Sequence, residues 1–239
     1  MPNNDFYIGY LEKMPPSFRG PVRVFVLAAG LLLAVASFII VKSQQFFSTS
    51  TFELGRLTTV EGILRMEPAP ILQLETGKDQ QGQPILQSIL LIGFGKHGAE
   101  AALEKAEAQR KLKLNGKKVK LEGTLIYHDG KTLLELTRKE ESVLDVVEAA
   151  PISRQYADLG QATLRGEIAD PKCYFGVMKP GEGKVHRSCA ARCIAGGIPP
   201  VLKTVASDGQ VQYFIIKGED GGPANEQILP IVGEPVQLS

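Results

Sequence analysis

The hydrophobic positions of this chain form one long uninterrupted run near the N-terminus and many short runs after it. Residues 24–41 are uncharged and apolar, and they lie between Arg23 and Lys42. At about 1.5 Å of rise per residue, such a run nearly crosses a hydrocarbon core about 30 Å thick. The pattern therefore predicts a transmembrane helix over residues 22–42, preceded by a cytoplasmic tail of residues 1–21.

A cleaved signal peptide is the rival interpretation of this run. The apolar region of a signal peptide is only about 7–15 residues long and precedes a cleavage site of small residues, whereas the one Ala-x-Ala string here, at 34–36, lies inside the run. Basic residues gather before the run and only Lys42 follows closely, which keeps the N-terminus in the cytoplasm: Lys13, Arg19 and Arg23. We expect a single-pass inner-membrane protein whose bulk is extracytoplasmic, that is, periplasmic.

The short runs after residue 51 are separated by Gly and Pro, which is typical of β-strands. The Asp129-Gly130 pair between two alternating runs predicts a hairpin, and a stretch of helix formers before Gly116 predicts one helix, over residues 99–112. The predicted strands cover residues 58–66, 71–75, 87–94, 117–127 and 131–136. Residues 142–150 are helical or strand-like, and Pro151 marks a boundary. This order is typical of a small Greek-key barrel of the OB type, which we assign to residues 52–150.

A second β module is expected over residues 160–239, because parts of it resemble the first. Residues 164–168 resemble 60–64, residues 232–238 resemble 115–121, and residues 213–218 match 89–95. Chance similarity of short Gly-x-Val-x-Leu strings is the alternative. If the pairing holds, the second module lacks the last strand of the first, and its open edge would take a partner strand or a membrane-protein neighbour. The expected fold class is therefore mainly β (α+β), with two β-barrel-like modules after the helix.

Composition and charge narrow the function. The 239 residues are 44% hydrophobic, which argues against disorder, and 27 basic residues nearly cancel 26 acidic ones. No chain-wide field favours nucleic acid, so the expected partners are the membrane and a membrane protein, through the tail or the open edge. The sequence contains no Gly-x-Ser-x-Gly elbow or Ser/His/Asp signature for hydrolysis.

The chemistry is concentrated between residues 173 and 193, which contain all three cysteines. On a helix, His186, Cys189 and Cys193 would share one face, since they stand at i, i+3 and i+7. A Gly-rich turn at 181–183 would allow Cys173 to fold back as a fourth ligand, and Gly196-Gly197 with the prolines after them would end the helix. The four residues form a Cys3His set that suits zinc, or copper with Met178 as a thioether ligand.

Other interpretations of the three cysteines remain open. The Cys189–Cys193 spacing resembles the ligand pair of Sco-type copper-delivery proteins, but no thioredoxin-like βαβ pattern surrounds it, so the resemblance extends to the ligands alone. A thiol-disulfide site is the first alternative, with nearby basic residues lowering a thiol pKa: Lys184, His186, Arg187 and Arg192. A structural disulfide with one leftover cysteine is another. Fe–S and haem ligation have little support.

The Gly93–Gly98 string, Gly-Phe-Gly-Lys-His-Gly, follows an apolar run and precedes the predicted helix. A dinucleotide-binding βαβ unit begins in this way, with Glu122 at the end of the next run, so a dinucleotide-binding enzyme with a parallel α/β domain is a second alternative function. The preferred interpretation of the string is a strand-to-helix turn whose free N–H groups hold an anion, because the upstream sequence favours a β hairpin and no second βαβ half follows. The preferred hypothesis is an accessory subunit of a membrane redox or metal-handling system that binds a metal through the Cys/His cluster.

Overall fold

The computed structural model describes residues 14–44, 50–149 and 158–239. Residues 1–48 and residues 49–239 are two separate compact units, and each is described by itself. The first part of the predicted tail and the boundary predicted at Pro151 lie outside the described residues.

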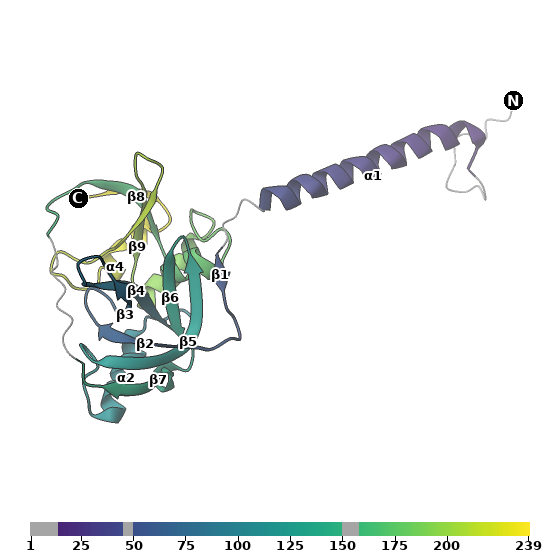
Figure 1. Cartoon of the computed structure of the whole chain (residues 1–239). Coiled ribbons are helices and arrows are strands. Elements are labelled where there is room, and N and C mark those ends of the chain that lie inside the picture. Colours follow the sequence, from purple (N-terminus) through teal and green to yellow (C-terminus); the bar gives the residue numbers. More distant parts are fainter. Residues whose placement is uncertain (1–13, 45–49, 150–157) are drawn as a thin grey trace. The chain divides into compact units, whose positions relative to one another are not determined.

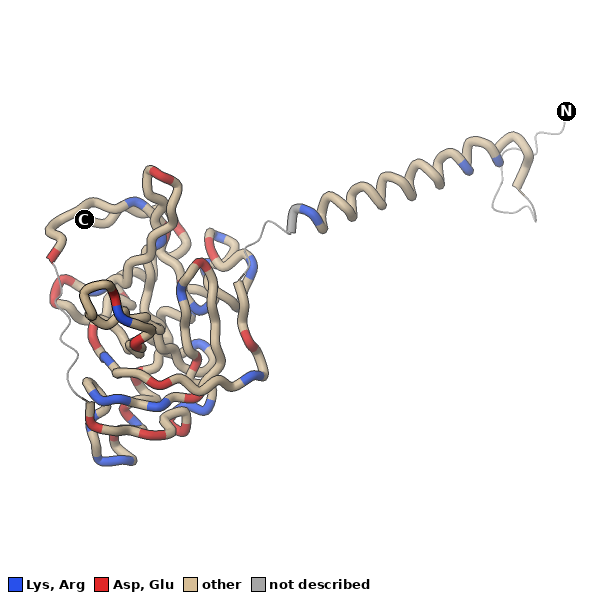
Figure 2. The backbone as a smooth tube through the Cα atoms, viewed as in Figure 1, with Lys and Arg blue, Asp and Glu red and all other residues tan. Residues whose placement is uncertain are grey.

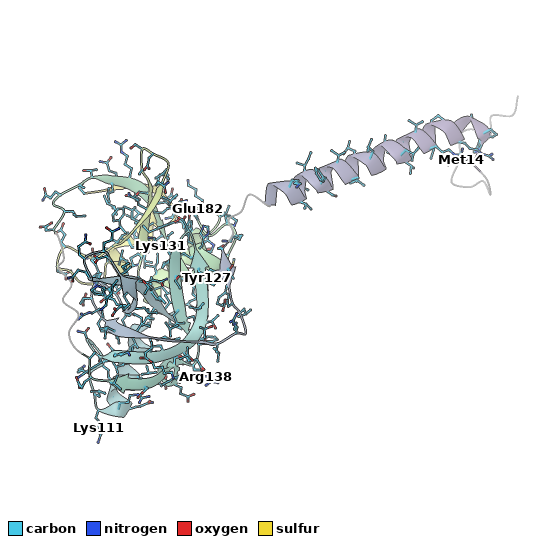
Figure 3. All side chains as sticks on the ribbon, in the orientation of Figure 1. Met14, Lys111, Tyr127, Lys131, Arg138 and Glu182 are labelled. Atoms are coloured by element: carbon cyan, nitrogen blue, oxygen red, sulfur yellow. The ribbon has the colours of Figure 1, made fainter. Side chains whose placement is uncertain are left out.

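The N-terminal unit contains one helix, α1 (Pro16–Gln44). It begins six residues before the predicted start at 22, because Pro16 occupies the first helical position, where a missing N–H costs nothing. Residues Pro16–Lys42 form a stretch of 27 residues that is long and apolar enough to cross a membrane. Figure 2 shows charge near its two ends only, and in Figure 3 its side chains project on all sides.

The first sheet of the second unit contains a closed five-stranded barrel. Its strands are β2 (Thr58–Arg65), β3 (Ile71–Lys78), β4 (Pro84–Gly93), β5 (Lys118–His128) and β6 (Lys131–Leu136). The order β5-β2-β3-β4-β6 closes because β6 also pairs with β5, and β4–β6 is the one parallel pair in this ring. In Figure 1, β5 curves across the barrel beside β6. Two short strands pair with β5 outside the ring, β1 (Thr51–Phe52) and β7 (Val143–Val147).

The predicted elements of this region are confirmed. Asp129 and Gly130 form the β5–β6 turn with φ of 51° and 68°, the left-handed conformations that a two-residue hairpin requires. The predicted helix is α2 (Glu100–Arg110), which the left-handed Lys111 ends. The ambiguous stretch after residue 142 is strand β7, which follows a short 3-10 helix, η2 (Lys139–Ser142). The barrel interior is filled largely by leucines, among them Leu64, Leu72, Leu91, Leu121 and Leu134.

The second sheet has four antiparallel strands in the order β10-β9-β8-β11. They are β8 (Leu164–Ala169), β9 (Val201–Val205), β10 (Val211–Ile215) and β11 (Pro235–Leu238). Helix α4 (Asn225–Ile228) and the 3-10 turn η4 (Leu229–Ile231) connect β10 to β11. Helix α3 (Arg187–Ala195) packs on this sheet through Ala190 and Ile194.

The backbone confirms the internal repeat that the sequence predicts. Gly62 of β2 pairs with Val119 of β5, and Gly166 of β8 pairs with Val236 of β11 in the same register. A side chain at either glycine would collide with a carbonyl oxygen of the adjacent strand, at 2.5 Å for Gly62 and 2.0 Å for Gly166. Both modules therefore need glycine at the same point.

The third strand of each module continues the correspondence. Gly93 N–H donates to His97 O at 2.9 Å, and Gly218 N–H donates to Gly222 O at 2.8 Å, so Gly218 corresponds to Gly93 and not to Gly95, where the sequence match placed it. Strands β8, β9, β10 and β11 thus repeat β2, β3, β4 and the first half of β5. Within the described residues, no strand of the second sheet corresponds to β6, and β10 and β11 are its two edges.

The strand directions contradict the alternative of a parallel α/β domain around residues 93–122. Strand β5, which follows α2, runs antiparallel to β6, and β6 runs parallel to β4. Strands β4 and β5 are therefore antiparallel, whereas a dinucleotide-binding βαβ unit needs two parallel strands. The glycine string has another use, described below.

Candidate metal centre

The segment that contains the cysteines is a long insertion between β8 and β9, and it packs against the outer face of the barrel. Cys173, Phe175 and Cys193 form one buried cluster with apolar barrel residues, including Ile126 and Leu133. Leu133 and Leu134 are both buried although consecutive strand residues face opposite sides, because the insertion covers the outside of β6. The site is therefore enclosed on one side by the barrel wall.

Asp170 begins the insertion and organises its first turn. Its Oδ1 accepts from Lys172 N–H at 2.9 Å, and its carbonyl accepts from Tyr174 N–H at 3.0 Å. An Asp followed by Pro is the favoured start of a helix, and here it starts a single π-helical turn, η3 (Cys173–Val177). This turn directs Cys173 into the buried cluster.

The predicted helix through His186, Cys189 and Cys193 is confirmed as α3, which begins directly after His186. The turn at 181–183 returns the chain as predicted, since His186 N–H donates to Gly183 O at 2.9 Å. His186 and Cys193 are buried, and Cys189 is partly exposed. Helix α3 ends at Ala195, before the two glycines that were expected to end it.

The ligand atoms gather in two groups that share Cys173. In one, the ligand atoms of Cys173, His186 and Cys189 all lie within 4.8 Å of one another; in the other, those of Asp170, Cys173 and Cys193 do. The described residues hold no group that contains all four predicted ligands. Seven residues of helix rise about 10 Å, so His186 and Cys193 share a face of α3 but stand two turns apart.

Two buried polar atoms of these groups lack a partner. Among the described residues, His186 Nε2 and Asp170 Oδ2 are buried and form no hydrogen bond. The side chains of both are almost fully enclosed, with 3% exposure for His186 and none for Asp170. All three cysteines are free thiols, and Cys173 Sγ lies 3.8 Å from Cys189 Sγ. The arrangement can hold a metal ion.

Burial and neighbouring groups set the protonation of the site. A hydrogen bond with Cys193, burial and the Asp170 carboxylate raise the pKa of the Cys173 thiol. Burial lowers the pKa of His186 below its usual value, which leaves the imidazole neutral and able to donate a lone pair at pH 7. Metal ligation requires such a neutral imidazole and deprotonated thiols, so a bound cation would compete with protons for the sulfurs.

Sequence reasoning missed Lys96, the cation that contacts the cluster. Its Nζ lies 3.2 Å from Cys189 Sγ, and this hydrogen bond raises the pKa of Lys96. Two of the expected basic neighbours, Lys184 and Arg187, instead form ion pairs with Glu234, at 3.6 and 2.7 Å. Lys96 lies 93 residues from Cys189 in the sequence, so spacing contains no signal for this contact.

The glycine string around Lys96 packs against the end of α3. Gly98 N–H donates to Gly196 O at 2.9 Å. A Cβ at Gly196 would lie 1.8 Å from Lys96 O, and one at Gly98 would lie 2.3 Å from Gly197 O. The two glycine segments approach so closely that the string serves to dock α3 beside the barrel.

Met178, considered as a thioether ligand, is 43% exposed. Phe175 is buried against the cluster, and its ring packs edge-on against Tyr174 with centroids 5.3 Å apart.

Comparison of the chain with protein-family models, with curated proteins and with solved structures finds no match.

Proposed function

We propose that this chain is a membrane-anchored extracytoplasmic protein that binds metal, zinc or Cu(I), at the cluster that contains Cys173, His186, Cys189 and Cys193. The observation that supports this most strongly is the unpartnered His186 Nε2, buried beside free thiols. A buried polar atom without a partner costs about 1–3 kcal/mol. A metal ion at this point would remove that cost.

The separation of the two nearest sulfurs fits this proposal. Thiolates bind zinc at about 2.3 Å, so two of them on one tetrahedral ion stand about 3.8 Å apart. Cys173 Sγ and Cys189 Sγ have this separation, 3.8 Å. A set of sulfur and imidazole ligands favours zinc or Cu(I) over hard cations such as calcium and magnesium.

The wider role follows from the N-terminal helix. We assign α1 as a retained transmembrane anchor, with the cytoplasmic N-terminus that the basic residues before it favour. An anchored metal protein outside the membrane suits an accessory subunit of a redox or metal-handling system. We also assign the barrel to the OB type, which is supported by its strand order, its single parallel pair and the position of α2 between β4 and β5.

The open edge of the second sheet is the proposed contact with a membrane-protein partner. Ile216 N–H donates to Pro200 O at 3.0 Å on the β9 side, and backbone groups alternate sides along a strand, so those of Tyr213 and Ile215 face away from β9. An extended partner segment that pairs with them would take the place that β6 has in the barrel.

Anaerobic elemental analysis of the full-length chain, purified in a mild detergent, tests the metal proposal. We expect stoichiometric zinc or copper in the native chain and loss of metal in Cys189→Ser and His186→Gln. Met178→Leu is the matched control, because this other sulfur residue of the insertion is 43% exposed, and its replacement should leave the metal content unchanged. A native chain that is metal-free and fails to bind added Zn²⁺ or Cu(I) would refute the proposal.

A thiol redox site is the second candidate, and the Lys96–Cys189 contact favours it. An ammonium group beside a sulfur stabilises the thiolate, which is the nucleophile in disulfide exchange. This candidate predicts a metal-free protein in which Cys189 is alkylated before the two buried cysteines. Mass mapping after brief iodoacetamide treatment, with Lys96→Met as the variant that slows the reaction, distinguishes it from the metal site.

A further inference from the structure

The Cys/His cluster has more ligand atoms than one ion can use. The two ligand groups share Cys173 Sγ alone, and each has its own unpartnered buried atom. His186, whose Nε2 is unpartnered, belongs to the first group, and Asp170, whose Oδ2 is unpartnered, belongs to the second. A single ion bound by the first group would still leave the Asp170 oxygen buried without a partner.

The helix geometry separates the two groups in space. Ligands of one tetrahedral ion stand less than about 4 Å apart, because each is about 2.0–2.3 Å from the metal. His186 and Cys193 are two turns apart on α3, about 10 Å along its axis. Within the described residues, no group of ligand atoms lying within 4.8 Å of one another contains both His186 and Cys193.

The charge of the cluster also exceeds what one divalent ion neutralises. With every ligand deprotonated, three thiolates and the Asp170 carboxylate total four negative charges, of which one zinc ion neutralises two and the Lys96 ammonium beside Cys189 Sγ neutralises one. Asp170, Cys173 and Cys193 are buried, with 0%, 4% and 1% exposure, where uncompensated charge is expensive. Within the described residues, Asp170 takes part in none of the ion pairs, since the nearby Lys172 pairs with Glu135.

We propose that the site is binuclear, with Cys173 Sγ bridging two d¹⁰ ions. His186 and Cys189 complete the protein ligands of the first ion, and Asp170 and Cys193 complete those of the second. A thiolate sulfur has three lone pairs and can bind two ions at once. Each ion then has three protein ligands and one open position, and both unpartnered atoms gain a partner. This inference rests on the proposed metal-binding function and adds its stoichiometry and the ligand Asp170.

Titration of the metal-free full-length chain with Zn²⁺, followed by removal of unbound metal and elemental analysis, tests the proposal. We expect two zinc ions per native chain and one per chain in Asp170→Asn. Asparagine keeps the oxygen that accepts from Lys172 N–H, so the turn at 170–173 remains intact. Cys193→Ser should also bind one ion, and Met178→Leu should bind two. Circular dichroism of each variant establishes that it is folded, and Cys193→Ser replaces Asp170→Asn if the latter is not.

Each outcome separates this inference from the proposed function. One ion in the native chain, unaffected by Asp170→Asn, would overturn the binuclear site and leave the metal-binding function standing. Two ions in both Asp170→Asn and Cys193→Ser would place the second ion elsewhere and equally overturn it. No bound ion in the native chain would refute the proposed function itself. With Co²⁺ as the probe, a sulfur-to-cobalt absorption band that changes shape between the first and the second equivalent would support a shared thiolate.

Discussion

Lys172 Nζ lies 2.7 Å from Glu135 Oε1, and the two side chains are only 7% and 6% exposed. Lys172 stands between Asp170 and Cys173 in the insertion, whereas Glu135 belongs to β6 of the barrel. The same ammonium donates to Gly93 O at 3.2 Å and to Gly95 O. This buried ion pair therefore fixes the beginning of the insertion to the barrel wall.

Removal of one partner of this ion pair should lower the stability of the fold. We expect Lys172→Met to lower the free energy of unfolding by about 3–5 kcal/mol, because Glu135 is left buried without its cation. The double variant Lys172→Met/Glu135→Leu should recover much of that loss, since it buries no unpaired charge. Urea denaturation followed by circular dichroism measures both.

The exposed pair Lys105–Glu140 provides the control for this comparison. The Lys105 side chain is 67% exposed, so Lys105→Met should change the free energy of unfolding by no more than about 1 kcal/mol. Equal effects of the two lysine substitutions would contradict the structural role of Lys172.

The close approach of the glycine string to α3 gives a second prediction. Gly196→Ala should destabilise the chain by about 1–3 kcal/mol, because the new methyl group forces the end of α3 away from Lys96 O. Because α3 contains Cys189 and Cys193, metal affinity should fall with stability. Gly77→Ala is the matched control, since no atom lies within 4 Å of its added Cβ. Thermal unfolding and metal titration of both variants provide the measurement, and an unaffected Gly196→Ala chain would refute the docking role.

The local features of this fold were accessible from the sequence. The Asp129-Gly130 turn fixes its hairpin through backbone conformation alone, and the i, i+3, i+7 spacing fixes a face of α3. Residues on one helix face can still lie two turns apart, so a shared face does not bring their ligand atoms to one point. The predicted four-ligand set therefore divides between two groups. Sequence analysis did not identify Asp170 as a ligand. Its capping role and its burial depend on the barrel that encloses it, and neither is visible in local spacing.

The weak internal repeat was readable for a different reason. Gly62 and Gly166 must be glycine because the adjacent strand leaves no room for a side chain, so these positions remain recognisable while their neighbours differ. The glycine string at 93–98 allowed two interpretations because the same residue type serves two purposes. Close approach of a nucleotide and close approach of a helix end both require glycine, and the strand directions decide between them.

His128 predicts a dependence of stability on pH outside the metal centre. Its Nδ1 is buried without a hydrogen bond, and burial followed by the charge of Lys179 lowers the pKa of its imidazole. The unfolded chain binds this proton below about pH 6.5, whereas the folded chain binds it only at lower pH. The contribution of His128 to the free energy of unfolding is therefore fully present above about pH 6.5, and it is lost as the pH falls from there towards the folded-state pKa.

We expect His128→Gln to reduce the slope of the melting temperature against pH between pH 7 and the folded-state pKa. The remaining slope includes His186, whose pKa burial also lowers. Thermal unfolding of the metal-free protein measures the slope, and the NMR titration of the His128 ring gives its pKa directly. A folded-state pKa at or above 6.5 would contradict this account.

The open edge of β10 predicts a contrast between two equivalent amides. Leu91 N–H donates to Pro70 O and Ile216 N–H donates to Pro200 O, so Ile215 has the place in β10 that Leu90 has in β4. Leu90 is paired with β6, and Ile215 has no corresponding neighbour among the described residues. Hydrogen exchange of the isolated chain should be fast at Ile215 and slow at Leu90 and at Phe214, which faces β9. A protected Ile215 amide in the monomer would mean that the edge is already covered.

The basic residues that flank α1 predict its orientation in the membrane. Arg19 and Arg23 flank the start of the apolar stretch, whereas Lys42 is the basic residue near its end. Because cytoplasmic flanks are enriched in Lys and Arg, the unit formed by residues 49–239 should be digested by protease added to spheroplasts while an N-terminal tag stays protected. Replacement of Lys13, Arg19 and Arg23 by Gln should increase the fraction of chains in the opposite orientation.

The intact mass of the purified protein should include the first residues, and a mass that lacks residues 1–36 or more would identify a cleaved signal sequence in place of an anchor.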